Sequence, residues 1–386
     1  MGIYSEYLML LSSKGLEELE KERKKQLNRI SANRANDILV IASDLSGRPE
    51  KSRAPISIDF TDKLAITDLI GSLGNTDLDV IIETYGGSAE IVEDIVEILR
   101  CKFKGNISFI VPGCAKSAGT IMVMSGDEIL MGSDSTLGPI DAQVFMNGKF
   151  ISADACIAGL DDIKEEVSKS GRLNPAYIPI LQGLSPGEIK SWKIAQKFAS
   201  YLVSKWLVSY KFRNWRHHST NGIAVTEEEK IARAGEIAVW LTRHDVWLTH
   251  ARSIKLEDLK RIGLLVNDYS NNADLNDAIS RYYVLLRILF EVTPVYKIFE
   301  TPTERIIRML AVQFQAAQKP SKSRQPVCVD VQCPKCGEKE TFCRTNEANE
   351  PLPENAIPFP ADNMHKCRKC GFDMNLSPIK EQLDKF

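Results

Sequence analysis

Short apolar runs alternate with helical patterns between residues 36 and 145. The apolar runs predict strands, and segments with apolar residues at helical spacing predict helices. In chain order these elements are Asp37 to Ala42, Leu64 to Leu73, Leu78 to Ile82, Ala89 to Leu99, Ile107 to Val111, Ser117 to Ser125 and Glu128 to Met131. This alternation implies right-handed βαβ crossovers and a largely parallel sheet. The pattern therefore predicts an α/β core.

Helical patterns flank this core on both sides. Residues 1–34 begin with spaced leucines and continue with dense mixed charge, which predicts an amphipathic helix or helical pair that covers a partner surface. Residues 185–245 are predicted mostly helical, and their aromatic stretch, Trp192 to Trp215, is expected in a core or a subunit interface. A final helical pair is predicted at Leu275 to Leu289 and Thr303 to Gln318.

Composition narrows the protein class only slightly. A chain of 386 residues with 44% hydrophobic residues can bury a large core and is expected to hold two or three domains. Its 49 Lys and Arg nearly balance 51 Asp and Glu, so the molecule as a whole is not built to coat nucleic acid. We find no signal-peptide pattern and no apolar run long enough for a membrane span. A soluble, cytoplasmic protein is expected.

Four cysteines near the C-terminus form two Cys-x-x-Cys pairs, each followed by glycine: Cys333 and Cys336, then Cys367 and Cys370. This spacing suits two knuckle turns whose sulfurs converge on one structural Zn²⁺. Disulfides or free thiols are the alternative. Cys328, Cys343 and His365 lie nearby as spare ligands. We therefore expect a zinc ribbon at 328–386, after a polar linker at 319–327 and a helical extension at 271–318, with a helical segment at 1–35 and the main α/β domain at 36–270.

Glycine and serine follow two of the predicted strands and point to acyl transfer. Gly86 and Gly87 come after the run that ends at Ile82, and Ser117 and Ala118 come after the run that ends at Val111. At a strand-to-helix turn, backbone N–H groups are unpaired and favour developing negative charge. Amides of the Gly86-Gly87 turn and of Ala118 could therefore form an oxyanion hole for attack by the hydroxyl of Ser117. The alternative is that Ser117 merely caps a helix.

Several segments, taken in order, resemble one family. Tyr85-Gly86-Gly87-Ser88 is similar to the Pro-Gly-Gly loop of the Clp protease subunit and of signal peptide peptidases, and Cys114 to Gly119 resembles their nucleophile turn. Leu137 to Gln143 and Thr249 to Ile254 resemble segments of the related serine dehydrogenase proteinase family. The sequence departs from these patterns at Tyr85, where the family has proline, and at Lys116, where the Clp subunit has a small residue.

The resemblance implies a Clp-peptidase or crotonase-like fold and a catalytic triad. Carried over onto the matching positions, the triad is Ser117 as nucleophile, Asp141 as orienting carboxylate and His250 as general base. Signal peptide peptidases use a lysine instead, which leaves Lys164 as the second candidate base. The resemblance further implies a protein or peptide substrate and a homo-oligomer, with residues 1–34 and the aromatic helix as candidate contacts.

Two other functions remain open on the sequence. A crotonase-type acyl-CoA enzyme shares the paired backbone donors but needs no serine nucleophile. A non-catalytic scaffold would use the ribbon to bind a protein or nucleic acid, although acidic residues offset the basic residues of the ribbon. We expect a serine peptidase that hydrolyses peptide bonds through an acyl-enzyme on Ser117.

Overall fold

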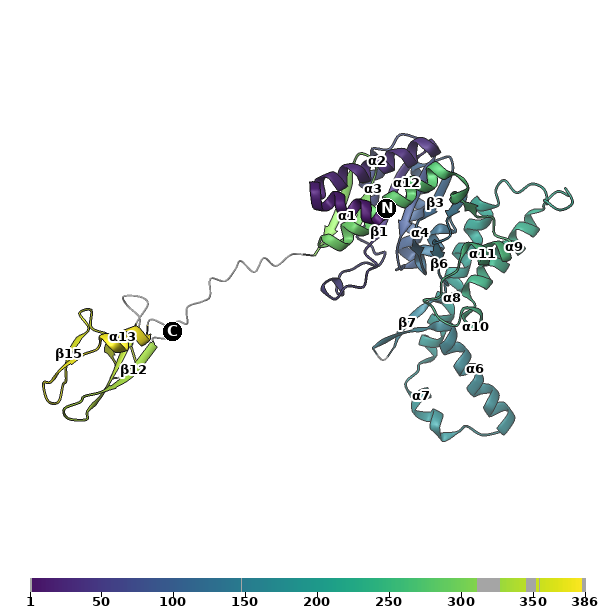
Figure 1. Cartoon of the computed structure of the whole chain (residues 1–386). Coiled ribbons are helices and arrows are strands. Elements are labelled where there is room, and N and C mark those ends of the chain that lie inside the picture. The colour runs from purple at the N-terminus through teal and green to yellow at the C-terminus, as the bar shows by residue number, and fades with distance from the viewer. Residues whose placement is uncertain (1, 147, 311–326, 345–351, 354, 384–386) are drawn as a thin grey trace. The chain divides into compact units, whose positions relative to one another are not determined.

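The computed structural model describes residues 2–146, 148–310, 327–344, 352–353 and 355–383. The chain divides into two compact units, residues 1–311 and 312–386 (Figure 1). Each unit has its own buried apolar cluster, and each is described by itself below.

A mixed sheet of seven strands forms the centre of the first unit, in the order β11-β10-β1-β2-β3-β5-β9. The strands β1, β2, β3 and β5 run parallel, as the sequence predicts. The short strand β9, which the sequence analysis did not predict, pairs with β5 in parallel, and β10 and β11 extend the β1 edge in antiparallel orientation. Their bounds are Asp37–Ser43 for β1, Leu78–Glu83 for β2, Ile107–Val111 for β3, Glu128–Met131 for β5, Asn267–Asp268 for β9, Val295–Glu300 for β10 and Arg305–Met309 for β11.

Helices cover both faces of this sheet, and the side chains of β1 show how. Ile38 and Val40 pack in one apolar cluster with Leu27, whereas Leu39 and Ile41 belong to the cluster on the opposite face. Alternate residues of a strand point to opposite faces, so a strand covered on both sides is apolar throughout. The covering helices are α2 (Leu16–Arg34) and α12 (Ala273–Val292) on the first face, and α3 (Asp62–Gly71), α4 (Ala89–Lys102) and α5 (Ala118–Val123) on the second.

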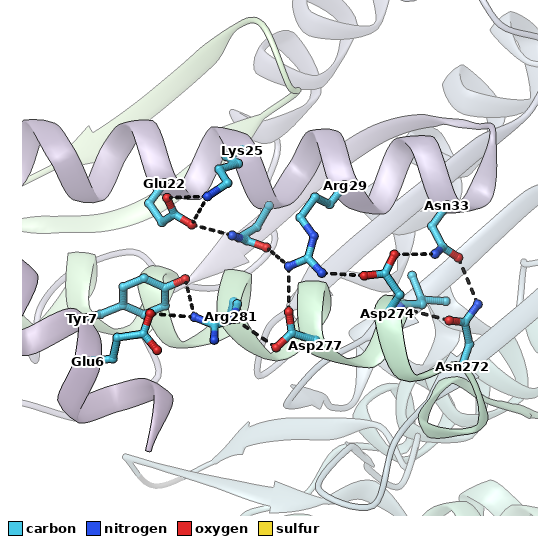
Figure 2. A network of polar contacts seen from close by, with 12 residues as sticks. Glu6, Tyr7, Glu22, Lys25, Arg29, Asn33, Asn272, Asp274, Asp277 and Arg281 are labelled. Carbon is cyan, nitrogen blue, oxygen red and sulfur yellow. Dashed lines mark hydrogen bonds and ion pairs between the residues drawn. The ribbon is translucent and has the colours of Figure 1, made fainter. Parts of the chain in front are cut away.

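The N-terminal helices α1 (Ile3–Lys14) and α2 pack on the protein itself. A polar network joins α2 to α12 beside it, in which Arg29 pairs with Asp274 at 2.6 Å and with Asp277 at 2.7 Å (Figure 2). On the same helix, Leu27 and Ile30 are fully buried in the unit's own core. The prediction that residues 1–34 cover a partner surface was therefore wrong for the apolar side of α2.

A second correction concerns the residues after α12. The sequence predicts a helix at Thr303 to Gln318, but Arg305–Met309 is the edge strand β11, and residues 311–318 lie outside the described part. The neighbouring strand β10 pairs with β1, for example Glu300 opposite Val40. Local periodicity does not reveal pairing with strands that are distant in sequence. Here pairing at the edge of the sheet determines the conformation, and the helical pattern does not.

A mainly helical region lies between a β-hairpin and strand β9. The hairpin of β7 (Gln143–Met146) and β8 (Lys149–Ser152) is followed by helices, of which α8 packs against α6 and α9. Trp192 and Trp206 of α8 are buried, so these aromatic residues serve the core. The helix bounds are α6 (Ala153–Ser170), α7 (Ile178–Gln182), α8 (Pro186–Trp206), α9 (Glu227–Thr242), α10 (His244–Trp247) and α11 (Leu256–Arg261). No helix in the described ranges is long and apolar enough to cross a membrane.

The second unit is a small β-rich module. Its elements are β12 (Val327–Gln332), β13 (Lys339–Arg344), β14 (Ile357–Pro358), β15 (Met364–Lys366), β16 (Asp373–Asn375) and α13 (Ser377–Leu383). Cys328 and Cys343 face each other across β12 and β13 and form a disulfide, so they are not spare metal ligands. The predicted linker, apart from Val327, lies outside the described residues. The predicted domain boundaries stay predictions.

Candidate functional site

Ser117 occupies a sharp turn between the short strand β4 (Cys114–Ala115) and α5. Its backbone has φ 51° and ψ −121°, and its side chain makes no capping hydrogen bond. Ser88, by contrast, has extended backbone and caps α4 by accepting the amide of Ile91. The alternative that Ser117 is an ordinary helix cap therefore does not describe this residue.

The turn at Ser117 is held from both sides. The amide of Lys116 donates to Thr84 O at 3.0 Å, and the amide of Ile121 donates to Ser117 O at 3.1 Å. A non-glycine residue at positive φ costs about 1–3 kcal/mol, so it persists only where its surroundings fix it. Backbone strain of this kind is concentrated at functional sites, which favours a chemical role for the half-buried Ser117.

The glycine loop lies directly against this turn. A Cβ atom added to Gly86 would come within 2.7 Å of Lys116 O and 2.8 Å of the Cβ of Ser117. The backbone of Gly86 also has φ 105°, which side chains rarely allow. Only glycine fits here, because the loop backbone touches the backbone that carries the serine.

Two amides at this contact are free to bind an oxyanion. The amide of Gly86 already donates to Thr84 Oγ1 at 3.0 Å, so the predicted role of this residue as a donor gives way to one of close packing. Within the described part of the chain, the amides of Gly87 and Ala118 have no hydrogen-bond acceptor. Backbone N–H groups without an acceptor, close in the chain to the glycine loop and the serine, are the kind of donors that can stabilise a tetrahedral intermediate.

The structure brings Asp141 and His250 together. His250 Nδ1 lies 2.7 Å from Asp141 Oδ1, and Gln143 donates to the other carboxylate oxygen at 3.3 Å. Asp141 is buried, whereas the His250 side chain is 27% exposed. An ionised carboxylate only accepts hydrogen bonds, so this contact assigns the N–H to Nδ1 and leaves Nε2 as an acceptor. In the described residues the Ser117 hydroxyl makes no hydrogen bond, so its proton transfer to His250 stays a prediction.

Backbone pairing and one threonine connect the three segments of the site. Leu137 and Ile254 exchange two backbone hydrogen bonds of 2.9 Å, which places the His250 turn beside the strand that leads to Asp141. Thr120 Oγ1, in the first turn of α5, lies within hydrogen-bonding distance of both the N and the O atom of Gly138. Sequence reasoning gave Thr120 no role, because a threonine inside a small-residue helix has no distinguishing signal.

The second candidate base, Lys164, lies on an exposed face. Its ammonium pairs with Asp161 of the same helix at 2.6 Å, and its side chain is 68% exposed. A lysine needs burial to become a base near neutral pH. The surroundings of Lys164 do not provide that burial, so they favour His250.

A buried carboxyl that sequence reasoning passed over lies at the end of the strand that leads into the glycine loop. Glu83 ends β2, accepts the amide of Cys114 at 2.8 Å and the hydroxyl of Tyr283 at 3.1 Å, and is almost completely buried. Burial raises the pKa of Glu83 to about 7, against the opposing effect of these hydrogen bonds. A charged residue at the end of an apolar strand was the available signal.

Glu83 makes stability depend on pH. Between its ordinary pKa of 4.5 and about 7, the folded state holds a proton that the unfolded state has lost. The free energy of unfolding should therefore fall as pH rises through this window, by about 3 kcal/mol. In Glu83→Gln this decrease should disappear. Urea titrations at pH 5 and pH 8, followed by tryptophan fluorescence, would measure it, since all five tryptophans lie between residues 192 and 247. An equal decrease in both proteins would contradict the prediction.

The four predicted metal-binding cysteines converge in the second unit. The Sγ atoms of Cys333 and Cys370 are 3.7 Å apart, those of Cys336 and Cys367 are 3.6 Å apart, and all four lie within 4.8 Å of one another. Tetrahedral zinc–sulfur bonds of about 2.3 Å place sulfurs about 3.8 Å apart, so this cluster fits Zn²⁺. Both knuckles end on a glycine at positive φ, Gly337 and Gly371.

Comparison with known families supports part of this picture. Residues 4–154 match the ClpP-like SDH-type serine proteinase family, which confirms the resemblance seen in the sequence for this part of the chain. The match includes the glycine loop, Ser117 and Asp141 and ends before His250 and the cysteine cluster. It supports a serine peptidase in general terms.

Individual relatives add little detail. An uncharacterized protein of Methanocaldococcus jannaschii, MJ1495, is 36% identical over 67 residues, which are 17% of this chain and 23% of that protein. The chain thus spans about a quarter of that relative. A mutant of the 1510-N membrane-bound stomatin-specific protease is 19% identical and aligns with 46% of this chain and 72% of its own, at a TM-score of 0.23. At that TM-score the likeness carries no weight.

Proposed function

We propose that this protein is a serine peptidase that hydrolyses peptide bonds through an acyl-enzyme on Ser117. In the first step, Ser117 Oγ attacks the substrate carbonyl carbon while His250 Nε2 accepts its proton. The amides of Gly87 and Ala118 donate to the oxyanion, and Asp141 stabilises the imidazolium. His250 then protonates the leaving amine, and a water molecule, activated by the same imidazole, releases the acyl group.

One observation carries this proposal. The hydroxyl of Ser117 stands on a strained turn, directly against a glycine loop, with two amides that have no acceptor in the described part of the protein. No structural need of the helix or the sheet accounts for that combination. Covalent labelling of the purified chain by a fluorophosphonate probe tests the proposal, because such probes react with activated serines.

The identity of the base has its own test. His250→Ala should lower the second-order rate of labelling on the order of 10³-fold, since the hydroxyl loses its proton acceptor. Lys164→Met serves as the matched control and should react like the unmodified protein. The reverse result, a large loss in Lys164→Met with His250→Ala unaffected, would assign the base to Lys164.

The proposal extends to zinc and to assembly. We infer that Cys333, Cys336, Cys367 and Cys370 hold one structural Zn²⁺, because four thiolates close the coordination shell and leave no position for substrate. ClpP-like proteases typically act on protein substrates and oligomerise, so we propose a protein or peptide substrate and a homo-oligomer here too. A cytoplasmic location and a protein or nucleic-acid partner for the ribbon also belong to the proposal.

A further inference from the structure

We propose that Lys116 is a positioning residue that fastens the turn bearing His250 to the turn bearing Ser117. The inference rests on the proposed function, and Lys116 is a position at which the sequence departs from the Clp-type pattern. Its side chain leaves the nucleophile turn one residue before Ser117 and ends on residues 251–253. It therefore bridges two segments that are far apart in the sequence.

The ammonium of Lys116 uses all three of its N–H groups on that turn. Nζ donates to Ala251 O at 2.8 Å, to Arg252 O at 3.0 Å and to Ser253 Oγ at 3.0 Å. An ammonium carries three donors and no acceptor, so three converging oxygens satisfy it completely. Two of the acceptors are backbone carbonyls, which means that the lysine holds the path of the main chain directly after His250.

The other end of the lysine is fixed to the nucleophile. Its amide donates to the O atom of Thr84, the residue that follows β2, and its carbonyl accepts the amide of Gly119 at 2.8 Å. Its stem lies against Gly138, where an added Cβ would come within 2.9 Å of Lys116 Cδ. The side chain is half-buried, and burial lowers the pKa of Lys116. A side chain that is packed along its stem and bonded at both ends holds the two segments that it joins in a fixed relative position.

Position matters here because the base must reach the serine hydroxyl. Asp141 fixes the orientation of the His250 ring through Nδ1. The position of the ring also depends on the position of the backbone turn that carries it. A displacement of about 1 Å at a reacting group can cost on the order of 10²-fold in rate. The three hydrogen bonds of Lys116 fix the position of that turn relative to Ser117.

The first test compares three variants by the rate of fluorophosphonate labelling between pH 5.5 and 9. Lys116→Met keeps the stem but removes the donors, and it should label on the order of 10²-fold more slowly and lose the rise with pH that general-base assistance gives. Lys116→Arg, which restores donors and charge, should recover most of the rate. Lys255→Met removes a charge close by, from a lysine bonded to Asp134 O, and should match the unmodified protein.

The second test is independent of catalysis. Hydrogen–deuterium exchange of peptides covering 249–254 should become faster in Lys116→Met and stay unchanged in Lys255→Met, with the sheet strands protected in both. Ser253→Ala, which removes one acceptor, should show a smaller change of the same kind and serves if Lys116→Met does not fold. Unchanged exchange at 249–254, or labelling of Lys116→Met at the original rate, would overturn the inference. Absence of labelling in the unmodified protein would instead refute the proposed function, and exchange would still decide whether Lys116 fastens the turn.

Discussion

Replacing Ser117 with alanine should abolish covalent labelling and lower the rate of peptide hydrolysis by on the order of 10⁴-fold or more. The reason is that the hydroxyl forms the acyl-enzyme, so that its loss leaves only the oxyanion donors and substrate binding. The variant should fold normally, because the side chain of Ser117 makes no capping bond that α5 needs. Labelling of the intact chain, followed by mass spectrometry of the modified peptide, measures the first effect, and cleavage of an unfolded protein substrate measures the second.

Ser88→Ala is the matched control for this experiment. Ser88 lies on the same glycine loop, but its hydroxyl caps α4, so its loss should cost about 1 kcal/mol of stability and leave labelling intact. Equal labelling of Ser117→Ala and the unmodified protein would place the reactive group elsewhere. Absence of labelling together with tight binding of coenzyme A would favour the acyl-CoA enzyme, which uses the same paired amides without a serine nucleophile.

Removal of zinc should unfold the C-terminal unit while the α/β unit stays folded. The buried apolar residues around the cysteines are few, among them Phe342 and Leu376, so metal coordination has to supply most of the stability. Structural Zn²⁺ in such modules contributes about 10–16 kcal/mol near neutral pH. Elemental analysis should find one zinc ion per chain. A strong chelator, or Cys336→Ser, should release it, with rapid hydrogen exchange at 327–344 and 355–383.

The control for metal loss uses a cysteine of the other unit. Cys101 is exposed in α4 and far in sequence from the cluster, so Cys101→Ser should retain the zinc and the exchange pattern. A chain that contains no zinc when purified without chelators, yet protects its ribbon from exchange, would contradict the proposed role of the metal. Persistent folding after complete chelation would do the same.

The sequence predicted the parallel core because its signals are local. The run from Leu78 to Ile82 is apolar apart from Asp79, as expected for a strand covered on both faces, and glycine follows it where the backbone of Gly86 later meets Ser117. Such local residue types indicate a buried strand and the turn after it, even when the neighbouring strand is not known. The cysteine knuckles were predictable for the same reason, since the Cys-x-x-Cys spacing is typical of metal ligands.

Features that depend on distant partners were beyond the sequence. Thr303 to Gln318 carries apolar residues that also fit a helix, and only the free edge of β10 makes Arg305–Met309 a strand. The bond between Lys116 and the His250 turn joins residues that no periodicity relates. Glu83 could be seen at the end of its strand, but its altered pKa comes from burial beneath other segments. Long-range packing decides each of these.

The antiparallel pair β10 and β11 determines where a shortened version of this protein could end. A fragment cut at residue 270, where the sequence suggests that the domain stops, would leave the backbone edge of β1 uncovered and prone to pair with another molecule. It would also leave the buried guanidinium of Arg23 without its carboxylate partner, Glu300, which lies 2.9 Å away. A shortened chain that keeps the sheet intact therefore has to run through Met309.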